Sequence, residues 1–154
     1  MGNLHSHQLI ESLTGGMPSD LSGVVRLGID IVHIPRIAES LRAFGERFEG
    51  RLFAPGEIAY SRSAPDQHAQ RLAARFAAKE ATIKAVGLSE AGVNWREMEV
   101  RRHADGSCEL VLHGVAAQAA RAAGIARCIV CLSHDGDYAA AVVAALSDRD
   151  ELGR

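Results

Sequence analysis

One stretch decides the fold: Arg75-Phe76-Ala77-Ala78-Lys79-Glu80-Ala81-Thr82-Ile83-Lys84. It predicts the middle of a long helix that runs from about residue 66 to residue 86 and ends at Gly87. Ser63 and Asp66, just before it, have the spacing of a capping box. One side of this helix is an apolar stripe that must face a core, made of Leu72, Phe76, Ile83 and Val86. Beside the stripe runs a lane of small side chains, Ala73, Ala77 and Ala81.

Glu80 and Lys84 lie one helical turn apart on the flank of this alanine lane. Such a pair is usually a solvent-exposed ion pair, which stabilises a helix by about 0.2–0.5 kcal/mol. The small neighbouring side chains suggest a second possibility, a surface that another backbone or a ligand can approach closely. Taken alone, these residues favour the ordinary ion pair.

A second stretch, residues 24–37, predicts a strand that leads into a helix beginning at Pro35. Alternation along the strand leaves Gly28 and Asp30 on one face. The other face is apolar and consists of Val25, Leu27, Ile29 and Ile31. An ionised carboxylate in such an apolar strand needs a cation or hydrogen-bond donors around it.

These two stretches form a spaced double motif. Gly28-Ile29-Asp30-Ile31-Val32 with Arg36-Ile37 comes first, and Arg75-Phe76-Ala77-Ala78-Lys79-Glu80-Ala81 with Lys84-Ala85 follows. The chain thereby resembles the holo-acyl-carrier-protein synthases, the small 4′-phosphopantetheinyl transferases. The resemblance extends from about Val24 to Leu146, and it includes Leu132-Ser133-His134 and Tyr138-Ala139-Ala140-Ala141.

The resemblance implies a reaction and a metal site. Members of this family move 4′-phosphopantetheine from coenzyme A to a serine of apo-acyl carrier protein, and adenosine 3′,5′-bisphosphate leaves. Asp30 and Glu80 match the family's two acidic motif positions, which implies that they bind Mg²⁺. Glu80, or a water that it holds, would act as general base. Lys84 matches the motif lysine that lies near the leaving phosphate.

The resemblance also implies coenzyme contacts at Lys79, Lys84, Gly87 and His134. Gly87 matches a backbone position that cradles a phosphate, and His134 matches a histidine that contacts the coenzyme, in some cases from a neighbouring subunit. Lys79 falls within the apolar stripe of the long helix. Its stem must therefore pack, and its ammonium reaches either a coenzyme phosphate or an edge of the core.

The helix that begins at Pro35 carries a basic flank. Ile37, Leu41, Phe44 and Phe48 form its expected buried stripe. Arg36 and Arg47 share one side, with Arg51 nearby and Arg42 as a further positive charge. Arg36 matches the family's carrier-protein contact, and acyl carrier proteins are acidic, so we expect a docking surface here. An ordinary solvated basic face is the alternative.

The remaining elements alternate between hairpins and helices. We expect a strand at residues 97–103, a turn at Asp105-Gly106, a returning strand at residues 108–112 and a helix at residues 114–123. Strands at residues 125–132 and 138–146 follow. This order predicts an α+β fold in which the long helix packs on a small, mostly antiparallel sheet. We expect a flexible leader at residues 1–23, one domain at residues 24–146 and a polar tail at residues 147–154.

Composition narrows the setting. The chain has 154 residues, a net charge of −2 and no apolar run near the roughly 20 residues of a membrane span. We therefore expect a cytoplasmic protein that binds neither nucleic acid nor membrane. Its three cysteines suggest reduced thiols. Cys128 and Cys131 should lie on opposite faces of a strand, which suits neither a metal site nor a redox pair.

The family resemblance implies a homotrimer with active sites between subunits. It leaves open whether the carrier protein serves primary fatty-acid synthesis or a specialised fatty-acid or polyketide pathway. Two other functions stay possible: a non-catalytic carrier-protein-binding module that keeps the fold, and a Mg²⁺-dependent nucleotide phosphohydrolase. The intact Asp30, Glu80 and Lys84 favour the transferase over the binding module.

Overall fold

The computed structural model describes residues 23–89 and 91–147. Most of the expected leader and tail therefore lies outside the described residues. The elements run in the order β1 (Val24–His33), α2 (Ile34–Phe44), α3 (Glu46–Leu52), α4 (Pro55–Arg62), η1 (Pro65–Gln67), α5 (His68–Val86), η2 (Trp95–Glu97), β2 (Met98–Arg102), β3 (Cys108–Leu112), α6 (Gly114–Ala122), β4 (Arg127–Asp135) and β5 (Tyr138–Leu146).

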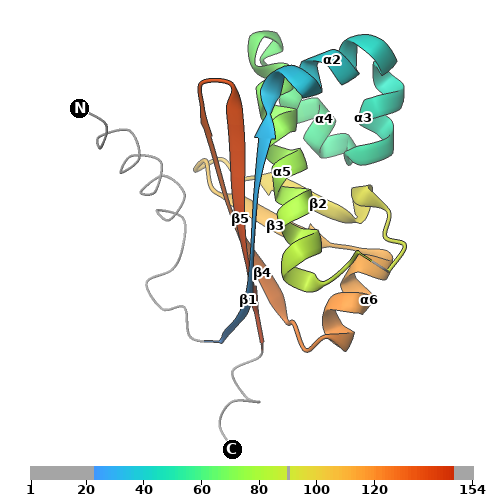
Figure 1. The fold of residues 1–154 in the computed structure, drawn as a ribbon, viewed down its shortest axis with the longest axis vertical. Helices are drawn as coiled ribbons and strands as arrows, with labels where there is room; N and C mark the ends of the chain where they lie inside the picture. The colour runs from blue at the N-terminus through green and yellow to red at the C-terminus, as the bar shows by residue number, and fades with distance from the viewer. Residues whose placement is uncertain (1–22, 90, 148–154) are drawn as a thin grey trace, which may run out of the picture.

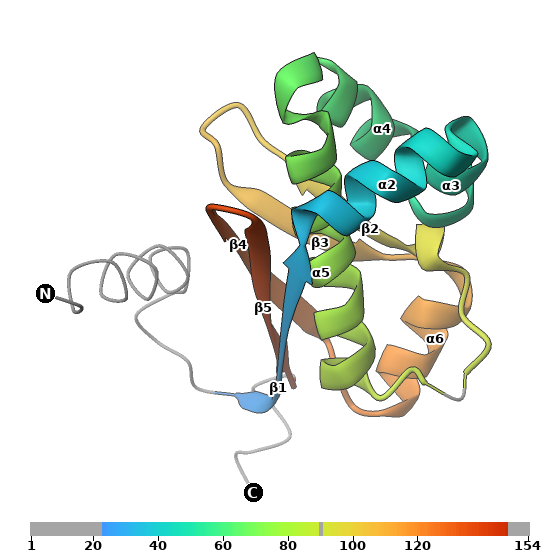
Figure 2. The same ribbon diagram turned by 45° about the horizontal axis from the view of Figure 1, so that its top comes forward.

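The long helix α5 packs on a three-stranded antiparallel sheet with the strand order β1-β5-β4 (Figure 1). The β2–β3 hairpin forms a second, two-stranded sheet that lies behind α5 in the view of Figure 2, with β2 against α5 and β3 next to β4. Helices α2, α3 and α4 gather at the end of α5 where it begins. The predicted α+β fold with a long helix on a small antiparallel sheet is confirmed.

The alanine lane of α5 is the contact between this helix and the sheet. Ala73, Ala77 and Ala81 are fully buried. Gly28 of β1 lies against this lane, since a Cβ atom at Gly28 would overlap the Ala81 carbonyl and come within 3.0 Å of the Ala85 nitrogen. The expected close approach of another backbone is thus real, but that backbone is β1 of the same chain.

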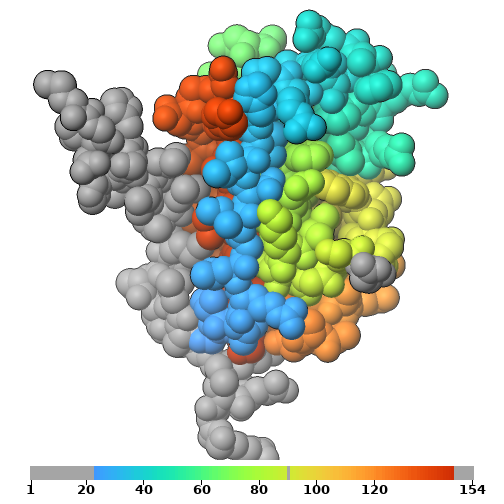
Figure 3. All heavy atoms as spheres, in the orientation of Figure 1, coloured from blue at the N-terminus to red at the C-terminus, as the bar shows by residue number. Residues whose placement is uncertain are grey.

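Strand β1 turns its small, polar face inward and its apolar face outward. Gly28 is buried beneath α5, while the four apolar side chains of the other face are 48–64% exposed: Val25, Leu27, Ile29 and Ile31. Figure 3 shows β1 at the surface beside α5. The predicted alternation is confirmed. We call this outward row of four side chains the β1 outer face.

The predicted capping box is wrong. The 3₁₀ turn η1 separates Ser63 from α5, which begins only at His68. Ser63 instead ends α4, and its hydroxyl donates to the Tyr60 carbonyl at 2.7 Å. Because this hydroxyl is used at the end of the preceding helix, it does not cap α5, and no described side chain caps the N-terminus of α5.

The predicted stripe on the basic helix is wrong at Phe44. The helix stops there because Gly45 adopts a positive φ of 51°, and a separate helix, α3, starts at Glu46. Ile37 is buried as predicted, whereas Phe44 is 63% exposed.

The register of β4 against β5 pairs Cys128 with Ala145 and Cys131 with Val142, which puts the two thiols on opposite faces as predicted. Burial raises the pKa of Cys128 to about 11. Among the described residues, no helix is both long and apolar enough to cross a bilayer.

Candidate active site

Asp30 and Glu80 line one cavity of about 640 Å³. Its walls come from the end of β1, from α2 and from α5, and they include Arg36 and Phe76. The two acids lie 50 positions apart in the sequence, and the packing of α5 on β1 brings them together. The predicted pair of carboxylates therefore lines the same cavity, which we call the acid cavity.

Lys84 joins Asp30 rather than Glu80. Its ammonium donates to the Asp30 carboxylate at 3.0 Å and to the Ile29 carbonyl at 3.0 Å. The Lys84 side chain remains 54% exposed, while that of Asp30 is only 14% exposed. The ammonium is thus held at the open side of β1, beside the two acids, where it can meet an incoming anion.

Glu80 is electrostatically strained in this position. Burial raises the pKa of its carboxyl, the negative charge of Asp30 raises it further, and Lys84 opposes both effects. Two carboxylates that repel one another across a cavity fit Mg²⁺, which prefers one or two protein carboxylates and takes phosphate and water oxygens for the rest. The donor set therefore suits the predicted metal.

Lys79 does not reach this cavity. Its side chain is fully buried, and its ammonium donates to Glu57 at 2.9 Å, to the Trp95 carbonyl at 3.1 Å and to the Met98 carbonyl. All three N–H donors of the ammonium are used. Of the two possibilities for Lys79, packing in the core is the one that the structure shows. Lys79 is therefore not part of the proposed coenzyme contacts.

Gly87 ends α5 in the left-handed conformation, with a φ of 77°. Its N–H donates to the Ile83 carbonyl at 2.9 Å, so this donor is already used within the helix cap. The guanidinium of Arg26 lies beside it, with Nη1 3.2 Å from the position that a Cβ of Gly87 would take. Gly87 can offer a phosphate close approach, but not a free N–H.

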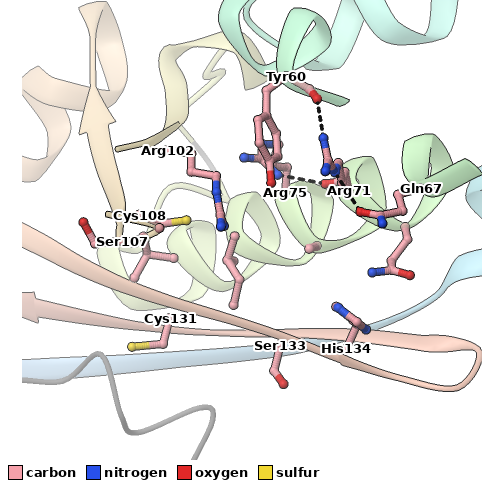
Figure 4. A pocket seen from close by; sticks show the side chains of 15 residues that line it. Tyr60, Gln67, Arg71, Arg75, Arg102, Ser107, Cys108, Cys131, Ser133 and His134 are labelled. Atoms are coloured by element: carbon pink, nitrogen blue, oxygen red, sulfur yellow. Dashed lines mark hydrogen bonds between the residues drawn. The ribbon is translucent and has the colours of Figure 1, made fainter. Parts of the chain in front are cut away.

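A second cavity, of about 470 Å³, is strongly basic (Figure 4). The ring of Tyr60 lines it, with the guanidinium carbons of Arg71, Arg75 and Arg102 at 4.3, 4.3 and 5.5 Å from the ring centroid. His134 lines the same cavity, and none of the described carboxylates does. We call this cavity the basic pocket.

Arg75 is the unusual member of the basic pocket. It is 3% exposed, and its Nε has no hydrogen-bond partner among the described residues. Burial lowers the pKa of its guanidinium. No ion pair to Arg71, Arg75 or Arg102 forms within the described part of the chain. A buried cation without a counter-charge, with two further arginines beside the same ring, predicts an anionic ligand.

The sequence pointed to His134 but not to the rest of the basic pocket. Arg75 opens the helical motif and Arg71 lies one turn before it, so their shared helix face was a usable sign. Tyr60 and Arg102 come from α4 and β2, and nothing in their local sequence marks them. Figure 4 shows His134 on the pocket side of β4, with Ser133 pointing away.

Within this chain, the predicted metal pair and the predicted coenzyme contact His134 do not line one cavity. Asp30 and Glu80 line the first cavity, His134 lines the basic pocket, and the two cavities have no described lining residue in common.

The predicted docking arginines also separate. Arg36 lines the cavity of the two acids, whereas Arg47 and Arg51 line a shallow groove with Phe44 and Phe48. That groove combines exposed positive charge with exposed aromatic surface.

The model of the 4′-phosphopantetheinyl transferase superfamily matches residues 26–143. The chain belongs to this superfamily. The holo-[acyl-carrier-protein] synthase of Koribacter versatilis is 46% identical over 121 residues, which cover 78% of this chain and 96% of that protein.

Solved structures of the superfamily share the fold. The holo-[acyl-carrier-protein] synthase from Neisseria meningitidis has a TM-score of 0.71 at 33% identity, covering 79% of this chain and 98% of that one. The Chronobacterium ammoniagenes ACPS–CoA complex has a TM-score of 0.69 at 35% identity, covering 80% and 98%. Superfamily membership, predicted from the double motif, is thus confirmed, while the roles of single residues remain predictions.

Proposed function

We propose that this chain is a holo-acyl-carrier-protein synthase. It transfers 4′-phosphopantetheine from coenzyme A to the serine hydroxyl of apo-acyl carrier protein and releases adenosine 3′,5′-bisphosphate. The observation that carries the proposal is that Asp30 and Glu80 line one cavity, with Lys84 bonded to Asp30, in a member of this superfamily.

Glu80 is the proposed general base. Its carboxylate faces the cavity that Asp30 also lines, so it can accept the serine proton directly or through a water that it holds. It takes the serine proton while the serine oxygen bonds to the phosphorus of the phosphopantetheine arm. The bond from that phosphorus to the bridging oxygen of the diphosphate breaks, and the bridging oxygen leaves on adenosine 3′,5′-bisphosphate. Lys84, mostly exposed, neutralises the charge of the leaving phosphate.

Asp30 and Glu80 are the proposed ligands of Mg²⁺. When bound, the ion would polarise the diphosphate of coenzyme A and offset the negative charge that develops there. The protein contribution is the fixed pair of carboxylates, because burial of Gly28 under Ala81 anchors β1 against α5.

The basic pocket is the proposed site for the other phosphate groups of coenzyme A. Its three arginines and His134, with none of the described carboxylates in its lining, support an anionic ligand, and the Tyr60 ring offers a stacking surface. Since the acid cavity and the basic pocket are separate in one subunit, we propose that each coenzyme spans the acid cavity of one subunit and the basic pocket of its neighbour.

A homotrimer is the proposed assembly. The β1 outer face supports it, because four neighbouring apolar side chains that are 48–64% exposed need a cover. That face lies on the opposite side of β1 from Asp30. A subunit packed there would lie along the same strand that carries the metal ligand.

The carrier protein is the proposed macromolecular partner. Arg36, Arg47 and Arg51 with the exposed Phe44 suit an acidic helical protein that also offers an apolar contact. The proposed setting is the cytoplasm, where the thiols of the three cysteines would stay reduced.

The test is intact-protein mass spectrometry of apo-acyl carrier protein incubated with this chain, coenzyme A and Mg²⁺. We expect a mass gain of one phosphopantetheine, and its loss when a chelator is added. No gain with any of several carrier proteins would favour a non-catalytic binding module. Breakdown of coenzyme A without modification of the carrier would favour a nucleotide phosphohydrolase.

A further inference from the structure

Glu57 and Lys79 form an ion pair in the centre of the molecule, with both side chains fully buried. The two residues lie on α4 and α5, and the mechanism proposed above uses neither. Removing two charges from water is costly, and such pairs are often no better for stability than apolar residues of the same size. Stability alone therefore does not explain why this ion pair is buried here, and a second role has to be considered.

The pair binds three elements to one another through the backbone. The Glu57 carboxylate accepts the N–H of Ala54 at 2.7 Å, ahead of α4, and the N–H of Val100 at 3.0 Å, in β2. The Lys79 ammonium, on α5, donates to the carbonyl of Trp95, in η2, and to that of Met98, the first residue of β2. Each of these hydrogen bonds requires a particular distance and direction. The pair therefore fixes the relative positions of α4, α5 and β2.

Each of these three elements also contributes a side chain to the basic pocket, one helical turn or one strand repeat away from a residue that belongs to the pair or contacts it. Tyr60 lies one turn beyond Glu57 on α4, and Arg75 lies one turn before Lys79 on α5. Arg102 lies two residues beyond the bonded Val100, on the same face of β2. The tyrosine ring and both guanidinium groups thus depend on the geometry of one buried ion pair.

The pair also supplies charge. Among the described groups with an electrostatic effect on the buried Arg75 guanidinium, Glu57 is the only carboxylate. The positive charge of Arg75 in turn repels that of Lys79. Arg75 has no bonded counter-ion among the residues that the structure describes; its guanidinium donates to the Arg71 carbonyl at 3.2 Å and stacks on the Tyr60 ring, and Glu57 is the nearby buried negative charge.

We infer that Glu57 and Lys79 are positioning residues of the basic pocket, which hold Tyr60, Arg75 and Arg102 in the arrangement that binds the phosphates of coenzyme A. The inference rests on the proposed function. It assigns to Lys79 an indirect role in coenzyme binding, through the core, in place of direct contact with a phosphate.

The main test is the affinity for adenosine 3′,5′-bisphosphate, measured by titration calorimetry on the full chain at a temperature where circular dichroism shows each variant folded. We expect Lys79→Met to weaken binding by about tenfold or more, since residues of one hydrogen-bonded network couple by energies of that size. The KM for carrier protein should change less than about twofold.

Two further variants separate positioning from stability. Val143→Ala removes buried apolar volume from β5, outside the pair and the basic pocket, and should lower the melting temperature without weakening nucleotide binding. The double variant Glu57→Gln/Lys79→Met removes both charges and should regain stability relative to Lys79→Met. Its nucleotide affinity should stay low, because the backbone contacts to Trp95 and Met98 are not restored.

A measurement on the unaltered protein covers the case in which the variants do not fold. Amide hydrogen exchange at Ala54 and Val100, which donate to Glu57, should slow when adenosine 3′,5′-bisphosphate binds.

Equal affinity in Lys79→Met and wild type, an equal loss in Val143→Ala, or exchange unaffected by the nucleotide would each overturn the positioning role alone. No nucleotide binding by the wild-type chain would instead overturn the proposed function and the inference with it.

Discussion

Gly28 of β1 lies directly against Ala81 of α5, so closely that a Cβ atom at Gly28 would overlap the Ala81 carbonyl. This contact sets the depth at which α5 sits on β1 and therefore the relation between Asp30 and Glu80. We expect Gly28→Ala to destabilise the fold by about 3 kcal/mol, the upper range for overpacking. Thermal unfolding would measure it as a melting temperature lower by about 6–12 °C.

Gly50→Ala is the matched control for that substitution. Gly50 lies inside α3, and a Cβ atom added there would meet no described atom within 4 Å. Alanine at this position should therefore leave stability unchanged or raise it by up to about 1 kcal/mol. Similar melting temperatures for the two variants would contradict the close packing of β1 and α5.

Asp30→Asn should remove activity and leave the fold intact. The substitution keeps the shape of a side chain that is 14% exposed but takes away one of the two proposed metal-ligand charges. We expect kcat/KM for carrier modification to fall by about 10³-fold or more, since the metal supplies several kcal/mol to such reactions. Steady-state assays with circular dichroism on the same sample check both parts, and near-normal activity would exclude the metal pair.

Glu80→Gln should stabilise the metal-free protein while removing its activity. The pKa of Glu80 is raised in the folded state, so the folded protein binds this proton more tightly than the unfolded chain does. The contribution of Glu80 to stability is therefore greatest below its ordinary pKa of 4.5 and is lost as the pH rises through its folded pKa. At pH 7 the variant should melt about 1–2 °C higher than wild type.

Two conditions check the origin of that effect. The gain should vanish at low pH, where Glu80 is protonated in both states, and should shrink when Mg²⁺ is added, because the cation relieves the repulsion from Asp30. A gain that persisted under both conditions would not come from this carboxylate pair.

Reversal of Arg36 and Arg47 to glutamate should impair recognition of the carrier protein. The acidic partner would meet repulsion, so we expect its KM to rise by about tenfold or more, and by more than the KM for coenzyme A, because of the two arginines only Arg36 lines the acid cavity. Arg96→Glu with Arg121→Glu gives the same change of net charge at other exposed positions and should leave both constants near wild type. Equal effects on both substrates would argue against a docking surface.

Mixed assemblies should reveal whether each active site is shared between subunits. Asp30→Asn damages only the acid cavity and Arg102→Glu only the basic pocket. Mixing the two inactive variants by co-expression should restore activity at about a quarter of the interfaces in a random assembly. Asp30→Asn mixed with Glu80→Gln, both in the acid cavity, should restore none. Activity absent from both mixtures would place the whole site within one subunit.

The sequence by itself determined the superfamily and the fold class, and it singled out Asp30 and Glu80, the two acids that line the acid cavity. A strand and a helix each have a short period, so alternation separated Asp30 from the apolar residues of β1, and the 3.6-residue repeat set Glu80 beside Lys84. Periodicity, however, states only which residues share a face. It did not reveal that the apolar face of β1 lies outward, or that Gly45 would turn Phe44 into solvent.

Only the tertiary structure decided the partners of the charged groups. Lys84 bonds Asp30 across the packing of α5 on β1, and Lys79 finds Glu57 in the core instead of a phosphate. The basic pocket arises where α4, α5, β2 and β4 meet, from residues up to 74 positions apart, Tyr60 to His134. Charged groups pair with residues that are close in space but distant in the sequence. The local sequence pattern therefore does not indicate which side chain will be the partner of a buried charge.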